Sequence, residues 1–210
     1  MTKSNVIPRV VPYALEQLFV DQDRDLVHDT IAAALAWIPG QGKAKRKQPF
    51  RFEVEHLAGP QRARVQLDLT WDMTALESAI PGLRDQVRRL QTGRSAQREH
   101  ITELAAYALT LVAISVFLPG RRALAFRKGS APDILLDPAP GALRGVETAG
   151  RSAGGKSALL LVRNGRPAKG GLPKVPGKAS LLVGRADIAE VHLSLWSGSP
   201  RISIMEQVKP

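Results

Sequence analysis

The first part of the chain switches between helical and strand-like hydrophobic patterns. From Tyr13 to Ile38 the apolar residues recur every three or four positions, which predicts an amphipathic helix. Residues 50–57 and 62–71 alternate apolar and polar side chains on either side of a turn, which predicts a β-hairpin with one solvated face. Helical periodicity returns in Thr74–Leu90 and in Ser95–Leu118. The last four turns of the second helix are almost wholly apolar, so we expect it to enter the core.

After Gly120 the pattern changes to short strand-like segments separated by connections rich in glycine and proline. These segments are residues 123–127, 134–137, 143–148, 179–183, 190–196 and 201–208. The sequence therefore predicts an α+β fold, in which an N-terminal helix, a β-hairpin and a long buried helix precede a mixed β-sheet. Residues 1–120 would form a helical part with the hairpin and residues 121–210 a basic, β-rich part, together making one compact domain.

The composition of the chain excludes several kinds of functional site. The chain has 210 residues and no cysteine, which excludes a disulfide scaffold, a thiolate nucleophile and cysteine-ligated zinc or iron–sulfur sites. The N-terminus has no continuous apolar stretch typical of a secretory signal. The apolar run 104–118 is shorter than the roughly 20 residues that cross a bilayer. We expect a cytoplasmic protein that does not enter a membrane.

The positive charge is concentrated in the second part of the chain. Residues 1–120 carry 15 basic and 13 acidic side chains, whereas residues 121–210 carry 15 basic and 6 acidic ones. Such a one-sided field attracts polyanions, so we expect a nucleic acid as the partner, DNA rather than RNA. An acidic protein or another subunit of a complex is the alternative partner. The candidate phosphate-binding residues are Lys43, Lys45, Arg46, Lys47, Arg163, Arg166, Lys169, Lys174 and Lys178.

One literal motif lies in this basic part. Residues 150–157, GRSAGGKS, match the P-loop pattern GxxxxGK[ST] between a strand-like and a helix-like segment. In that reading Lys156 would reach the β- and γ-phosphates of a nucleotide and Ser157 would hold Mg²⁺. However, only about 50 residues follow, too few for the further βα units of such a domain, and no apolar run ending in aspartate follows. A small P-loop NTPase is therefore the third of our hypotheses.

A second pattern uses more of the chain. Pro132-Asp133 opens a strand, and a second strand carries Glu147. This segment resembles the PD-(D/E)xK nucleases, a restriction-endonuclease-like family. The resemblance implies that Asp133 and Glu147 lie on adjacent strands and hold Mg²⁺, the ion that activates water for phosphodiester hydrolysis. It also implies an acidic residue on the preceding helix, here Glu103.

The sequence departs from this family at one position. The lysine expected two residues after the glutamate is Ala149. Arg151 or Lys156 could supply the missing positive charge, although an arginine would act electrostatically and not as a base. Alternatively, Asp133 and Glu147 could form ordinary surface ion pairs, and the chain could be a non-catalytic subunit that binds nucleic acid or protein. The leading hypothesis is a nucleic-acid-binding protein that is either a Mg²⁺-dependent nuclease or a degenerate one.

Overall fold

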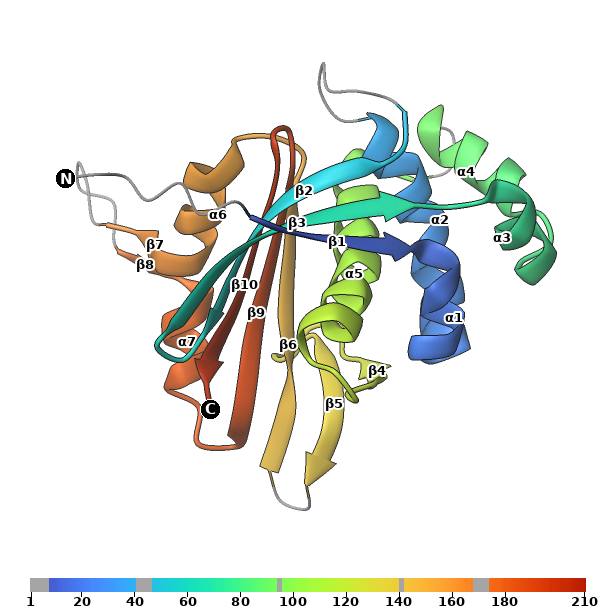
Figure 1. The fold of residues 1–210 in the computed structure, drawn as a ribbon. Coiled ribbons are helices and arrows are strands. Elements are labelled where there is room, and N and C mark those ends of the chain that lie inside the picture. The colour runs from blue at the N-terminus through green and yellow to red at the C-terminus, as the bar shows by residue number, and fades with distance from the viewer. Residues whose placement is uncertain (1–7, 41–46, 94–95, 140–141, 168–173) are drawn as a thin grey trace.

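The computed structural model describes residues 8–40, 47–93, 96–139, 142–167 and 174–210. The fold is mixed α+β and is built on an eight-stranded sheet with helices on both faces (Figure 1). In their order across the sheet, the strands are β1 (Arg9–Ala14), β3 (Gln61–Thr70), β2 (Phe50–Ala58), β10 (Arg201–Lys209), β9 (Ile188–Gly198), β6 (Ala142–Arg151), β5 (Ile134–Ala139) and β4 (Ala123–Phe126). Two short strands, β7 (Gly165–Arg166) and β8 (Val175–Pro176), form a separate two-stranded sheet. In sequence they lie in the connection from β6 to β9.

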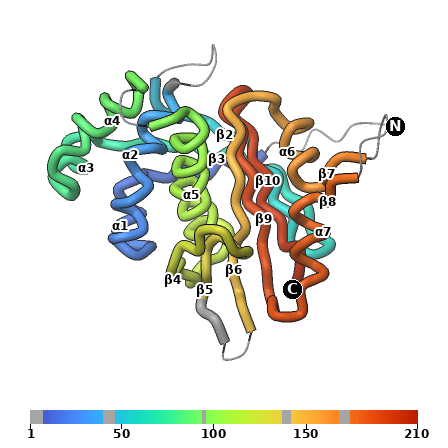
Figure 2. Tube along the Cα trace, turned by 180° about the vertical axis from the view of Figure 1, so that it is seen from behind, coloured from blue at the N-terminus to red at the C-terminus, as the bar shows by residue number. Residues whose placement is uncertain are grey.

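The helices divide between the two faces of the sheet. One face carries a 3-10 turn, η1 (Leu15–Gln17), together with α1 (Leu18–Asp21), α2 (Arg24–Gly40), α3 (Met73–Ala79), α4 (Leu83–Gln91) and α5 (Arg98–Phe117). The other face carries α6 (Gly155–Asn164) and α7 (Lys178–Val183), as both views show (Figures 1 and 2). Because each face is covered, the central strands are buried on both sides.

The C-terminal part of the sheet combines antiparallel and parallel pairing. β4, β5 and β6 are antiparallel neighbours, whereas β6 runs parallel to β9. A parallel pair needs a long crossover, and α6 and α7 lie in this connection. β10 then returns antiparallel to β9 and runs parallel to β2, which joins the hairpin to the rest of the sheet.

Two apolar clusters correspond to the two faces. The larger one joins α2 and α5 to the sheet, and the smaller one lies under α6 and α7. β9 contributes to both, with Leu193 in the smaller cluster and Trp196 in the larger one. A buried hydroxyl group, that of Thr110 on α5, accepts from Trp196 Nε1 at 3.3 Å and lies 2.8 Å from Thr148 Oγ1 on β6. This polar bridge ties α5 to the two strands.

The long apolar helix behaves as the sequence predicts. α5 is long and apolar enough to cross a membrane by length and composition alone, but most of its apolar window is buried inside the fold. Gly150 on β6 allows α5 to approach the sheet closely, since a Cβ there would lie 2.6 Å from the carbonyl oxygen of Thr102. The predicted hairpin is also confirmed, as β2 and β3.

Three predicted elements are wrong in whole or part. Tyr13 belongs to β1, paired with Leu69 of β3, and the long helix begins only at Arg24, where Asp23 Oδ1 accepts from the N–H of Asp25 at 2.9 Å. The helix predicted over 74–90 divides into α3 and α4 around Pro81-Gly82, since Gly82 takes a left-handed conformation.

The third wrong element is the strand predicted over 179–183, which is the helix α7. A short apolar run fits a helix and a strand equally well. Here Leu182 packs into the smaller apolar cluster, so tertiary contacts decide the conformation.

Candidate functional site

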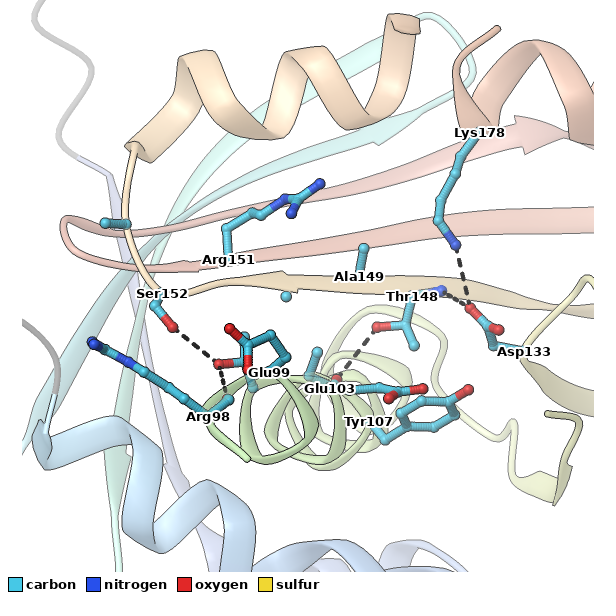
Figure 3. A pocket seen from close by; sticks show the side chains of 14 residues that line it. Arg98, Glu99, Glu103, Tyr107, Asp133, Thr148, Ala149, Arg151, Ser152 and Lys178 are labelled. Atoms are coloured by element: carbon cyan, nitrogen blue, oxygen red, sulfur yellow. Dashed lines mark hydrogen bonds and ion pairs between the residues drawn. The ribbon is translucent and has the colours of Figure 1, made fainter. Parts of the chain in front are cut away.

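A pocket of about 670 Å³ opens between α5 and the end of β6 (Figure 3). β5 pairs with β6 no further than Ile134 opposite Val146, so in the described chain the last residues of β6 have no β5 partner. This open strand edge is one wall of the pocket, and α5 is the other. The pocket residues that carry charge are Arg98, Glu99, Glu103, Asp133, Arg151 and Lys178.

Asp133 and Glu147 lie close together, with Glu147 on β6 and Asp133 just before the neighbouring strand β5. Asp133 directly precedes β5, and its Oδ2 accepts a 2.9 Å hydrogen bond from the N–H of Thr148. Glu147 is the residue before Thr148 on β6. Lys178, the first residue of α7, joins the two: its ammonium lies 3.7 Å from Asp133 Oδ2 and forms an ion pair with Glu147 Oε1. One cation is therefore shared by two carboxylates that belong to different strand segments.

Glu147 is the most buried of these groups. Its side chain is 8% exposed, and its Oε2 has no hydrogen-bond partner among the described residues. Burial raises the pKa of Glu147, while the adjacent Lys178 ammonium lowers it and the Asp133 carboxylate raises it further. A buried carboxylate with an unpartnered oxygen is costly, and packing alone does not account for it.

Glu103 and Tyr107 face the pocket from α5, one helical turn apart. Glu103 is half-exposed and lies 3.8 Å from the ring of His100. Figure 3 shows Tyr107 beside Asp133, opposite the open edge of β6. Among the described residues there is no group of three or more histidine, aspartate or glutamate side chains that could hold a metal ion. The acidic part of the site is thus a pair, with Glu103 on the opposite wall.

The positive charge comes from a residue that sequence reasoning placed elsewhere. Lys156 was one of two candidates to replace the missing lysine, but its ammonium is 2.5 Å from Glu55 on β2, outside the pocket. Lys178 was expected to be an exposed phosphate contact, yet it reaches Asp133 and Glu147. A Lys at the start of a helix, 31 residues after Glu147, carries no local signal of this role.

Arg151, the other candidate, does lie at the site. Glu147, Ala149 and Arg151 occupy every second position of β6, so their side chains share one face of the strand, the face toward α6 and α7. In Figure 3 the Arg151 guanidinium extends away from α5, on the same side of β6 as Ala149. Within the described chain neither Arg151 nor Arg98 has a side-chain hydrogen bond or ion pair. Both remain available for an anionic ligand.

The remaining candidate phosphate contacts are dispersed. Lys47, Arg166 and Lys174 are exposed. The guanidinium of Arg163 is held by both carboxylate oxygens of Glu206, with Nε 2.5 Å from Oε2. Four further candidates, Lys43, Lys45, Arg46 and Lys169, lie outside the described residues.

The P-loop-like segment connects β6 to α6. In a P-loop the backbone N–H groups at this position bind phosphate. Here the N–H of Gly154 donates to the carbonyl oxygen of Ser199 at 3.2 Å, and the N–H of Gly155 donates to Ser197 Oγ at 3.2 Å. Two of these N–H groups, and the Lys156 ammonium through its ion pair with Glu55, therefore already have partners within the protein.

Comparison of the chain with protein-family models, curated proteins and solved structures found no match of any of the three kinds. The site must therefore be interpreted from its own geometry. That geometry is a carboxylate pair bridged by an ammonium. Asp133 and Lys178 line the pocket, and its other charged residues are Glu99, Glu103, Arg98 and Arg151, of which the two arginines have no side-chain partner in the described chain.

Proposed function

We propose that this protein is a Mg²⁺-dependent nuclease of the restriction-endonuclease-like PD-(D/E)xK type, in which Lys178 replaces the lysine missing at position 149. The observation that carries the proposal is the Lys178 ammonium, which contacts both Asp133 and Glu147. The resemblance drawn from the sequence requires two acids on adjacent strands, a nearby lysine and an acid on the preceding helix. Asp133, Glu147, Lys178 and Glu103 supply these four groups from separate elements.

The carboxylate pair suits a divalent cation. Mg²⁺ prefers oxygen ligands, keeps several of its waters and is commonly held by one or two carboxylates. Asp133 and Glu147 already share one cation, the Lys178 ammonium, and within the part of the chain that the structure describes Glu147 Oε2 is buried without a partner. These two residues would hold the ion, which would lower the pKa of a bound water and neutralise charge on the phosphate.

The surrounding side chains would handle the substrate. Lys178 is 33% exposed at the pocket, so its ammonium can turn from the carboxylates toward an attacking water or a phosphate oxygen. Arg151 adds fixed positive charge on the same side of β6 as Ala149, where it would stabilise negative charge that develops on the phosphate. Hydrolysis joins the water oxygen to phosphorus, releases one proton of that water to solvent, and breaks the bond from phosphorus to the leaving sugar oxygen. The leaving oxygen takes up a proton from solvent.

Charge supports a nucleic acid as the substrate. The part of the chain that contains the site carries 15 basic and 6 acidic residues, and a phosphodiester backbone is the polyanion such a surface attracts. Arg98 and Arg151 give the pocket two guanidinium groups without protein partners in the described chain, at the α5 N-terminus and the β6 C-terminus. Phosphates flanking the cleaved bond would bind there.

Cleavage assays on labelled single-stranded DNA, duplex DNA and RNA, with Mg²⁺, Mn²⁺ or a chelator, test the proposal. The parent should cleave at least one substrate only with metal. Asp133→Asn should reduce the rate by more than the ~10- to 100-fold typical of losing an outer-shell partner. Asp85→Asn, a change at an exposed residue on α4, should leave the rate unchanged. Cleavage by Asp133→Asn at the parent rate, or no cleavage with any metal, would overturn the proposal. In the second case, nucleic-acid binding without turnover would identify a non-catalytic subunit.

A further inference from the structure

Tyr107 lies in the wall of the pocket. Its ring is packed against the protein, and its hydroxyl group is directed toward Asp133. The residue is 8% exposed, and its ring packs edge-on against Phe126 with 4.8 Å between the centroids. It follows Glu103 by one turn of α5, and both residues face the pocket. In Figure 3 the phenol oxygen points toward the Asp133 carboxylate.

We infer that Tyr107 is a positioning residue for Asp133: its hydroxyl donates to the carboxylate and holds it in the orientation that ligates the metal. The inference rests on the metal site proposed above, although it does not require that the bound ion promotes cleavage. Metal-ligating carboxylates generally need such outer partners, because a free carboxylate rotates about its χ2 angle.

The contacts of Asp133 show why a second donor is needed. The N–H of Thr148 and the Lys178 ammonium both approach the same oxygen, Oδ2. The backbone of Asp133 is held by the sheet, since its carbonyl oxygen accepts from the N–H of Arg127 at 2.7 Å, but both of these side-chain contacts reach a single carboxylate oxygen. A donor on α5 approaches from the opposite wall of the pocket, and α5 is fixed to β6 by the close approach at Gly150. Held from two elements, the carboxylate has one orientation.

The protonation of Tyr107 agrees with a donor role. Burial is the main cause that raises its pKa above the ordinary value, and the nearby carboxylates of Asp133, Glu103 and Glu147 raise it further. The direction of this shift favours the protonated phenol, whose O–H is a hydrogen-bond donor.

The chain contains a matched control. It has two tyrosines, and the other one, Tyr13, also donates to an aspartate, with its hydroxyl 2.7 Å from Asp21 Oδ2. Burial raises the pKa of Tyr13 as well. Tyr13 lies on β1, outside the pocket. Tyr→Phe at either position removes one hydroxyl and keeps the ring, so only the location differs.

The direct test is Mn²⁺ binding, followed by the loss of the free-ion electron paramagnetic resonance signal, in the parent, Tyr107→Phe and Tyr13→Phe. Tyr107→Phe should weaken binding about 10- to 100-fold, as expected for an outer-shell partner. It should raise the Mg²⁺ concentration for half-maximal cleavage by a similar factor, and excess Mg²⁺ should restore most of the rate. Tyr13→Phe should bind Mn²⁺ as the parent does.

Two results would overturn the inference: unchanged Mn²⁺ affinity in Tyr107→Phe, or equal weakening in both variants, which would indicate a general loss of stability. Failure of the proposed function gives a different pattern. A parent that binds Mn²⁺ through Asp133 but cleaves no nucleic acid, with binding still weakened by Tyr107→Phe, would reject the nuclease and retain the positioning role. A parent that binds no Mn²⁺ would reject both.

Discussion

Replacing Gly150 with alanine should separate α5 from the sheet and disturb the pocket between them. A Cβ at this position would lie 2.6 Å from the carbonyl oxygen of Thr102, 2.9 Å from Thr102 Cγ2 and 3.1 Å from Ala106 Cβ. Carbon–oxygen contacts between packed elements are about 3.3 Å or longer, so the helix must move by at least ~0.7 Å. The obstructing oxygen belongs to the helix backbone, so a rotamer change cannot relieve the overlap.

The cost of that movement can be estimated. Overpacking of this kind destabilises a core by about 1–3 kcal/mol. For a chain of this length each kcal/mol shifts the melting temperature by about 2–4 °C, so the variant should melt roughly 2–12 °C below the parent. Glu103 and Tyr107 would move with the helix, by more than the ~0.2 Å over which metal–ligand distances vary. Mn²⁺ affinity should therefore fall as well.

Thermal melts of Gly150→Ala and Gly184→Ala decide this prediction. Gly184 has right-handed helical dihedral angles, and the nearest atom to an added Cβ there is 3.7 Å away, so its replacement should leave the melting temperature within about 2 °C of the parent. If Gly150→Ala melts with the parent and binds Mn²⁺ equally well, the close approach of α5 does not determine the site geometry.

Two further predictions concern the charges of the site. Burial raises the pKa of Glu147, so the folded chain binds this proton more tightly than the unfolded chain and loses stability as pH rises through the folded pKa. The melting temperature of Glu147→Gln should therefore exceed that of the parent at alkaline pH, and the difference should shrink toward acid pH. A melting temperature below that of the parent at alkaline pH would contradict this prediction. Arg98→Gln combined with Arg151→Gln should reduce the slope of log affinity for single-stranded DNA against log salt by about 1.4, measured by fluorescence anisotropy. The control pair Arg62→Gln and Arg64→Gln on β3 should change the slope less, and an unchanged slope for the pocket pair would remove them as phosphate contacts.

The elements predicted correctly are those whose pattern is local. The β2–β3 hairpin alternates cleanly along its length, and α5 has a long apolar run with helical spacing, so neither depends on distant residues. β1 could not be recognised in the same way. Its six residues form a strand because they pair with β3, about 55 residues away in sequence, and the pattern continues into the next helix.

The sequence predicts that Asp133 and Glu147 lie close together, and it does not predict the cation between them. The β5–β6 pairing, local in sequence, ends at Ile134 opposite Val146, and Asp133 directly precedes it. Lys178 arrives through the crossover between β6 and β9, whose path depends on how α6 and α7 pack on the sheet. Tyr107 was missed for a similar reason, since the helical pattern shows a core residue and not which part of it reaches the pocket.

The central claim, that Lys178 has taken over the role of the missing lysine, is tested most directly by comparing Lys178→Ala with Lys156→Ala in metal-dependent cleavage. Loss of a group that acts on the attacking water or the phosphate should cost about 100-fold or more. Lys178→Ala should therefore cleave at least that much more slowly than the parent while still binding nucleic acid. Lys156→Ala, which breaks only the ion pair with Glu55, should cleave at the parent rate. Full activity in Lys178→Ala, or loss of activity in Lys156→Ala alone, would contradict the account.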